Sequence, residues 1–212
     1  LTKGENMKFF VNFLSAFRIA AAFAIIPLIM FSSYNPTIFW WATFIVFILA
    51  AISDWFDGYL ARKYNVCTKL GGVMDHIGDK LLVSNTLIML AALTPIWFIV
   101  VPVILMIARE LYISGLREFL GTQKIEMPVP KARFSMGKVK TALQMITITS
   151  FLLLFALSTM LTPEMDSRVM MWTVNILSQI GIWGLWLSLI ASVWSATQYT
   201  FTFAEKLKQI KE

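Results

Sequence analysis

Six long apolar stretches constrain this chain more than any other feature of its sequence. Each is long enough, or nearly long enough, to cross a bilayer. A single span in lipid must satisfy its own backbone hydrogen bonds, so each stretch is expected to be a helix. The sequence therefore predicts an all-α integral membrane protein with six transmembrane helices. The approximate spans are Phe9–Phe31, Ile38–Leu60, Leu81–Leu93 with a more polar lead-in from Gly71, Pro95–Leu116, Ala142–Leu161 and Met170–Val193.

Composition agrees with a membrane protein. Of the 212 residues, 58% are hydrophobic and 14% are charged, and the mean hydropathy is +0.72. Soluble domains carry roughly 25% charged residues. The formal charge of +6 would suggest a nucleic-acid partner in a soluble protein. Here the basic residues are better explained as topology signals, and no nucleic-acid partner is expected. Met7 is expected to be the native start, after a non-native leader over residues 1–6, and residues 7–212 are expected to form one membrane domain.

The basic residues are distributed unevenly between the two ends of the predicted bundle. The connections 32–37 and 94–97 carry no charge, and every Lys and Arg except Arg168 falls on the opposite side. Cytoplasmic loops of membrane proteins are enriched in Lys and Arg. The sequence thus predicts a cytoplasmic basic face with both termini on it, as expected for a multi-pass protein of the bacterial inner membrane.

Four carboxylates lie at this face, around the end of the second span and the start of the third. Asp54 and Asp57 are three residues apart, and Gly71, Asp75 and Asp79 follow one another at intervals of four, so each set shares one helix face. Acidic groups at a membrane boundary are costly and usually functional. If the two helices are adjacent, the four acids repel one another unless cations compensate them. Lys80 and Arg62 offset only part of this charge. All-oxygen ligands favour Mg²⁺, Mn²⁺ or Ca²⁺, so a divalent metal site is predicted.

The same stretch contains small residues and an arginine at fixed positions. It reads D-x2-D-G-x2-A-R-x8-G-x3-D-x3-D from Asp54 to Asp79. Small side chains at Gly58, Ala61 and Gly71 leave room for a ligand to approach the backbone closely. The complete string resembles the signature of the CDP-alcohol phosphatidyltransferase family, without a gap or a substitution.

The resemblance implies roles that spacing alone does not assign. It implies two Mg²⁺ or Mn²⁺ ions held by Asp54, Asp57 and Asp75. It implies Asp79 as the general base and as a further residue of the metal site. It further implies a site for CDP-diacylglycerol, lined by Gly58, Ala61, Arg62 and Gly71. Membrane lipids and a homodimer partner are expected on the same ground.

Three further segments resemble the phosphatidylglycerophosphate synthase branch of this family. Asn12 and Ser15, followed by Arg18, match its N-x-x-T-x-x-R opening, with Ser15 in place of Thr, and are assigned to the donor site. The segments 108–118 and 135–145 match its R-E-x-x-x-S-x-L-R-E and G-K-x-K-T-x-x-Q-M patterns. His76 stands where these synthases usually have Pro, and is expected to lie in solvent or behind the metal ligands.

A basic group near the fourth and fifth spans agrees with an acceptor that carries its own phosphate. Its members are Arg109, Arg117, Lys138 and Lys140. Guanidinium groups bind phosphate bidentately, and lysine adds a point charge. The favoured function is therefore phosphatidyl transfer from CDP-diacylglycerol to sn-glycerol 3-phosphate, with release of CMP.

Two alternatives remain at this stage. The first keeps the chemistry with another acceptor: phosphatidylglycerol, as in a cardiolipin synthase, an inositol phosphate, or serine. The second is a cation transporter that uses the acids as its ion site. A transporter predicts acids near the bilayer midplane, whereas these acids lie toward helix ends on the basic side.

Overall fold

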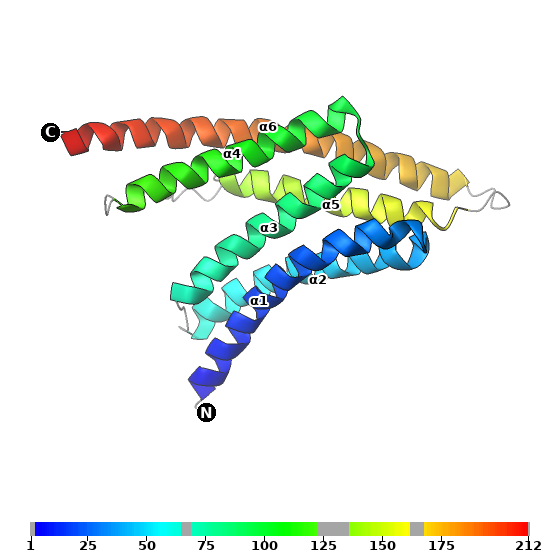
Figure 1. Cartoon of the computed structure of the whole chain (residues 1–212), viewed down its shortest axis with the longest axis horizontal. Coiled ribbons are helices and arrows are strands. Elements are labelled where there is room, and N and C mark those ends of the chain that lie inside the picture. Colours follow the sequence, from blue (N-terminus) through cyan, green and yellow to red (C-terminus); the bar gives the residue numbers. More distant parts are fainter. Residues whose placement is uncertain (1–2, 65–68, 123–135, 162–167, 212) are drawn as a thin grey trace.

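The computed structural model describes residues 3–64, 69–122, 136–161 and 168–211 (Figure 1). Within these residues the chain is helical and contains no strand. Six helices in the described part are long and apolar enough to cross a membrane, which confirms the predicted fold class. The elements are α1 (Lys3–Met30), the short 3-10 helix η1 (Phe31–Ser33), α2 (Pro36–Tyr64), α3 (Lys69–Leu93), α4 (Trp97–Thr122), α5 (Met136–Ser158) and α6 (Arg168–Lys211).

The described α-helices all extend beyond their predicted apolar spans at one end at least, and three of these extensions carry charged residues of interest. The polar lead-in at Gly71 belongs to α3, as predicted, so Asp75 and Asp79 are helical. Helix α5 begins at Met136, and the backbone of Lys138 and Lys140 is therefore helical too. Helix α6 continues to Lys211, well past the predicted span end at Val193, and its last residues are more polar than the span. The irregular loop predicted at 123–131 lies outside the described residues.

The helices form two groups of three (Figure 1). Helix α1 packs against both α2 and α3, and α6 packs against both α5 and α4. Contacts between α2 and α5, and between α3 and α4, join the groups. In Figure 1 the start of α1, the α2–α3 junction and the ends of α4 and α6 lie at the left. The basic ends of the helices therefore share one end of the molecule, as the sequence predicts.

Close packing between α5 and α6 depends on small residues. A Cβ atom on Gly184 would lie 2.5 Å from Thr147 Oγ1, and one on Gly181 would lie 2.9 Å from the Phe151 ring. Helices in lipid associate through such close approach, because lipid tails provide no hydrophobic driving force between them. The two glycines set the spacing of the second group of helices.

The interior of the bundle is apolar where the two groups meet. Ile25, Phe47, Leu82, Leu152 and Leu185 are almost completely buried in one cluster. Large apolar side chains also cover the outside of the helices, for instance Trp172, Trp183 and Trp194 of α6. Such an exterior suits lipid, which leaves the polar interior near the basic end as the place for chemistry.

Candidate functional site

The four predicted acids converge at the basic end of the bundle. Asp54 and Asp57 lie near the end of α2, and Asp75 and Asp79 lie in the first part of α3. Helix α2 makes few contacts with α3 directly, whereas α1 contacts both. Gly78 of α3 packs against Arg18 of α1, since a Cβ atom on this glycine would lie 3.4 Å from Arg18 Cδ, at van der Waals contact. Helix α1 thus supplies the third wall of the site.

Arg18 of α1 lies at the centre of the four carboxylates. Its side chain is 0% exposed. Its Nη1 atom lies 3.0 Å from Asp54 Oδ1, 2.7 Å from Asp75 Oδ1 and 2.9 Å from Asp79 Oδ1. Its Nη2 atom lies 2.7 Å from Asp57 Oδ2. These are short, charge-assisted contacts, so one guanidinium binds all four acids.

This arrangement adds a partner that the sequence did not assign to the acids. Arg18 was counted on the basic face and as the last residue of the N-x-x-T-x-x-R opening, and Lys80 and Arg62 were considered as partial partners of the acids. Arg18 is buried within the candidate span Phe9–Ser33, among the acids. A charged residue inside an apolar run was the available signal, since such residues face the bundle interior and pair. Among the residues that the structure describes, Arg18 is the cation that contacts these acids, and its single charge balances one of the four negative charges.

The geometry of the acids suits a hard divalent cation. Single carboxylate oxygens of Asp54, Asp57 and Asp75 lie within 4.8 Å of one another. Asp57 is buried, whereas Asp54 and Asp75 remain 38% and 45% exposed, so the cluster can be reached from outside. Oxygen-only ligands of this kind are those that Mg²⁺, Mn²⁺ and Ca²⁺ take. The residues therefore fit the predicted metal site.

The other donor-site residues surround this cluster where the structure describes them. Ser15 is buried and donates a hydrogen bond of 3.3 Å to Asp57 Oδ2. Gly71 is buried near the start of α3, and Asn12 lies one turn before Ser15 on α1. Gly58 follows Asp57 on α2. The backbone of Ala61 and Arg62 belongs to α2, but their side chains lie outside the described part of the structure.

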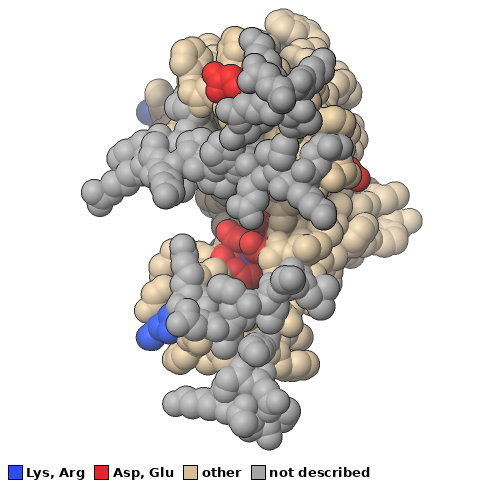
Figure 2. Space-filling view, turned by 90° about the vertical axis from the view of Figure 1, so that its left-hand side faces the viewer, with Lys and Arg blue, Asp and Glu red and all other residues tan. Residues whose placement is uncertain are grey.

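A large cavity extends from Asp54 to the basic residues. Its volume is about 1040 Å³, and Asp54, Lys80, Arg109, Arg117 and Lys140 are among its lining residues. Asp54 is the one of the four acids that lines this cavity. Figure 2 looks onto the left-hand end of Figure 1 and shows acidic side chains at the bottom of a hollow in that face. The cavity thus reaches from one predicted metal ligand to the predicted basic group in the other half of the sequence.

The basic side chains around this cavity differ in how freely they can bind a ligand. The Arg117 side chain is exposed, and its Nη2 donates a 2.9 Å hydrogen bond to the Tyr199 hydroxyl, with the guanidinium 5.0 Å from the ring centroid. Arg109 binds α6 instead, through Nε to the Ser192 carbonyl at 3.0 Å and Nη2 to Ser195 Oγ at 3.0 Å. Arg109 therefore connects α4 to α6 while it lines the cavity.

Glu110 is the acid within this basic group. It contacts Arg109 Nη1 at 3.1 Å and forms an ion pair with the buried Lys140. Lys80 of α3 donates a hydrogen bond to Ser114 of α4. The sequence places Glu110 next to Arg109, but it did not place Lys80 or Tyr199 beside the predicted acceptor site. The Lys138 side chain lies outside the described residues.

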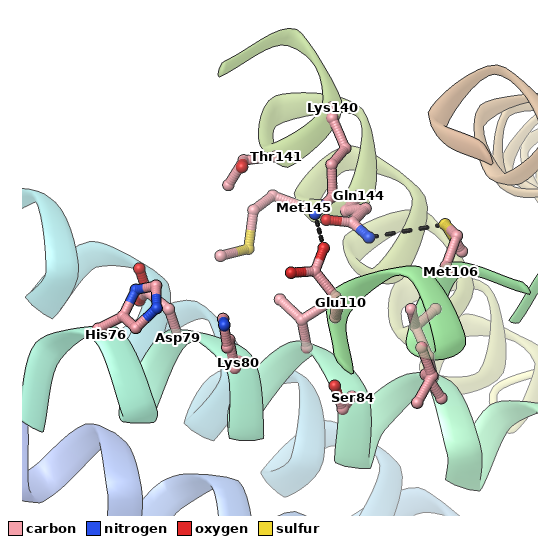
Figure 3. Close-up of a pocket in the computed structure, with 13 residues that line it drawn as sticks. His76, Asp79, Lys80, Ser84, Met106, Glu110, Lys140, Thr141, Gln144 and Met145 are labelled. Carbon is pink, nitrogen blue, oxygen red and sulfur yellow. Dashed lines mark hydrogen bonds and ion pairs between the residues drawn. The ribbon is translucent and has the colours of Figure 1, made fainter. Parts of the chain in front are cut away.

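A smaller chamber of about 150 Å³ extends behind the acids. Figure 3 shows it between α3, which carries His76, Asp79 and Lys80, and α5, which carries Lys140, with Glu110 of α4 reaching toward Lys140. His76 is exposed and lines both spaces, as a solvent-facing residue would. Asp79 is the acid that faces this chamber, and it stands outside the group of three whose oxygens lie close together.

The fold and the site together define a multi-pass membrane protein with a carboxylate cluster, one member of which lines a large cavity that also carries basic side chains. The sequence pattern of the CDP-alcohol phosphatidyltransferases matches residues 9–194. The chain therefore belongs to the CDP-alcohol phosphatidyltransferase family and is a transferase.

Curated relatives match most of the chain. A protein of Rickettsia bellii named CDP-diacylglycerol–glycerol-3-phosphate 3-phosphatidyltransferase is 38% identical over 80% of this chain and 88% of its own. Proteins with the same name from Sodalis glossinidius and Pectobacterium atrosepticum are each 35% identical. They cover 90% and 88% of this chain, and 92% and 90% of their own lengths.

Proposed function

We propose that the protein transfers the phosphatidyl group of CDP-diacylglycerol to sn-glycerol 3-phosphate, forming phosphatidylglycerol phosphate and CMP. The cavity that Asp54 of the acidic cluster shares with Arg109, Arg117 and Lys140 carries this proposal. The acids suit a donor whose pyrophosphate is bound with divalent cations, and the basic side suits an acceptor with its own phosphate. The names of the curated relatives point to the same two substrates.

The acids are proposed to hold two Mg²⁺ or Mn²⁺ ions, with Asp54, Asp57 and Asp75 as the main ligands. Divalent ions at such a site neutralise phosphate charge as it develops on the attacking and leaving oxygens. The donor's cytidine and ribose are proposed to lie along α1 and α2, where Gly58, Ala61 and Gly71 leave space. Asn12, Ser15 and Arg62 would add polar contacts to the donor. Its acyl chains would remain in the bilayer beside the helices.

Asp79 is proposed as the general base. It accepts the proton from the 1-hydroxyl of glycerol 3-phosphate while that oxygen attacks the phosphatidyl phosphorus. The new P–O bond forms as the P–O bond to CMP breaks, and CMP leaves with the bonding electron pair. Asp79 suits this role because it faces the small chamber between the acids and the basic group, where a free hydroxyl can reach it.

The acceptor phosphate is proposed to bind Arg117, Lys138 and Lys140, with Arg109 as their support. The exposure of Arg117 within the cavity favours a direct contact with phosphate. Arg109 donates hydrogen bonds to α6 and to Glu110, and this favours a role in fixing the cavity wall. A phosphate between them would also compensate positive charges that are expensive in a membrane protein interior.

The site is proposed to face the cytoplasm from the inner membrane. The basic ends of the helices lie on the side of the acids, and positive loops mark the cytoplasmic side. Both substrates would then enter from the compartment where nucleotides and phosphorylated metabolites are found. A homodimer is proposed on the family resemblance alone.

The test is an acceptor panel with purified protein in detergent micelles. CDP-diacylglycerol and Mg²⁺ are supplied with glycerol 3-phosphate, phosphatidylglycerol, inositol, inositol phosphate or serine, and CMP release is measured. Glycerol 3-phosphate is expected to give the highest kcat/KM. A higher value for phosphatidylglycerol or for serine would contradict the proposed acceptor, and no CMP release with any acceptor would contradict the proposed reaction.

A further inference from the structure

The environment of Arg18 carries an inference beyond the reaction itself. Its guanidinium touches one oxygen of each of the four acids at 2.7–3.0 Å and is fully buried. Three of those acids, Asp54, Asp57 and Asp75, are also the described group whose oxygens lie close enough to hold an ion. The Arg18 guanidinium and the proposed metal ion therefore use the same carboxylates as ligands.

We propose that Arg18 is an internal counter-cation that competes with divalent metal for these carboxylates. In this role it holds the acids together, and it weakens and so adjusts the affinity of the site for metal. The proposal rests on the proposed metal site but not on the identity of the acceptor.

The competition follows from charge and from geometry. Two cations that share ligands within a few ångströms repel each other, and the repulsion is strong where water is scarce. A carboxylate oxygen that accepts a short bond from Nη1 or Nη2 has also lost part of its capacity to bind an ion. Metal binding therefore requires Arg18 to lengthen or redirect contacts to Asp57 and Asp75, which costs part of the binding free energy.

The guanidinium is also incompletely satisfied where it lies. Its Nη atoms bind the acids, but the buried Nε has no hydrogen-bond partner among the described residues. An unpaired buried donor is a cost that a fixed structural arginine usually avoids. This makes the contact with the four acids easier to displace than a fully bonded arginine would be.

The test measures Mn²⁺ affinity directly, by electron paramagnetic resonance of free Mn²⁺ with protein in detergent micelles and without substrate. Arg18→Gln removes the charge, Arg18→Lys keeps it, and Arg109→Gln is the matched control, because Arg109 touches none of the four aspartates. Arg18→Gln is expected to lower the Mn²⁺ dissociation constant about tenfold. Arg18→Lys and Arg109→Gln are expected to stay close to wild type.

Thermal unfolding supplies a second readout that tests the stabilising part of the proposal. In EDTA, Arg18→Gln is expected to lower Tm by about 5 °C or more, because the acids then face one another uncompensated. Saturating Mn²⁺ should restore most of this loss, so the metal-induced rise in Tm becomes larger than in wild type. A purely structural arginine would lower Tm without increasing metal affinity.

A double variant keeps the test valid if Arg18→Gln does not fold. Arg18→Gln with Asp79→Asn removes one charge of each sign and leaves Asp54, Asp57 and Asp75 intact, and it is compared with Asp79→Asn alone. Tighter Mn²⁺ binding by the double variant supports the competition. Equal or weaker binding overturns it, and so does weaker binding by Arg18→Gln itself. If wild type binds no Mn²⁺, the proposed metal site fails and the competition fails with it.

Discussion

The two charged regions around the cavity carry excess charge of opposite sign, and in each region one residue of the other sign pairs with the group. On the α1–α3 side, four carboxylates surround the single arginine Arg18. On the α4–α6 side, Arg109 and Lys140 share the single carboxylate of Glu110, with Arg117 and Lys80 nearby on the cavity wall. In each region one opposite charge holds the group together but does not neutralise it. The remaining charge is negative where we propose that metals bind and positive where we propose that phosphate binds.

The comparison teaches how a membrane protein keeps charge available for ligands. Complete pairing would make the site stable and inert, and no pairing would make it too costly to bury. Partial pairing leaves each region with an excess that a ligand of the opposite sign relieves. The two regions should therefore respond differently when their ligands or their central residues are removed.

Removal of metal should have the largest effect. With three excess negative charges in the acidic region, the donor's pyrophosphate cannot approach without divalent cations. EDTA is expected to reduce CMP release below detection, and Mg²⁺ or Mn²⁺ added in excess of chelator should restore it. Full activity in chelator would show that Arg18 alone compensates the acids, and the proposed metal role would then be wrong.

Two acids within the acidic region should separate ligand from base. Asp79→Asn is expected to lower kcat at least a hundredfold, since a positioned general base contributes about 10²–10⁴-fold. It should still bind Mn²⁺ and CDP-diacylglycerol, because Asp54, Asp57 and Asp75 remain. Asp57→Ala should instead lose metal-dependent nucleotide binding, which calorimetry with a CDP ligand measures. Near-normal turnover in Asp79→Asn would contradict the base assignment.

The helices of this structure were largely predictable, because apolar length is a local property of the chain. The convergence of the four acids was also predictable, since spacings of three and four residues place each pair on one helix face. His76 is exposed, as a solvent-facing residue would be, whereas the burial of Gly71 does not test its predicted place beside the donor.

The partners of the charged residues were not predictable in the same way. Arg18 is 39 residues from Asp57 and 57 from Asp75, so their contact depends on how α1 packs against two other helices. Gly78, which packs against Arg18, lies beside a motif residue but is not singled out by the pattern. The ion pair of Glu110 with Lys140, across α4 and α5, is likewise a product of tertiary packing.

Arg117 tests the basic region with an intermediate effect. A hydrogen bond to a charged group contributes about 1.5–3 kcal/mol, so Arg117→Ala is expected to lower kcat/KM for glycerol 3-phosphate about ten- to a hundredfold. The KM for CDP-diacylglycerol should change little. Arg117→Lys should recover part of the loss, because a point charge cannot reproduce the planar fork. A raised KM for CDP-diacylglycerol with unchanged use of glycerol 3-phosphate would assign the basic region to the donor instead.

Glu110→Gln should have the smallest effect on activity. It tests most directly whether the basic region, like the acidic one, depends on a single residue of opposite charge. It removes the one negative charge that holds Arg109 and the buried Lys140. Lys140 then lies buried without its partner, so Tm is expected to fall by about 3–8 °C. Glutamine can still accept a hydrogen bond, and kcat should therefore stay within about tenfold of wild type. Glu118→Gln, at an exposed position of the same helix, is the matched control for loss of a carboxylate.

The ligand dependence of that variant completes the test. An acceptor phosphate brings negative charge to the same group of cations, so saturating glycerol 3-phosphate is expected to raise the Tm of Glu110→Gln more than that of wild type or Glu118→Gln. A Tm rise equal in all three proteins would mean that Glu110 and the acceptor phosphate do not compensate the same cations. The claim that excess charge awaits a ligand would then be wrong for the basic region. For the acidic region the same claim would still depend on the Mn²⁺ measurements.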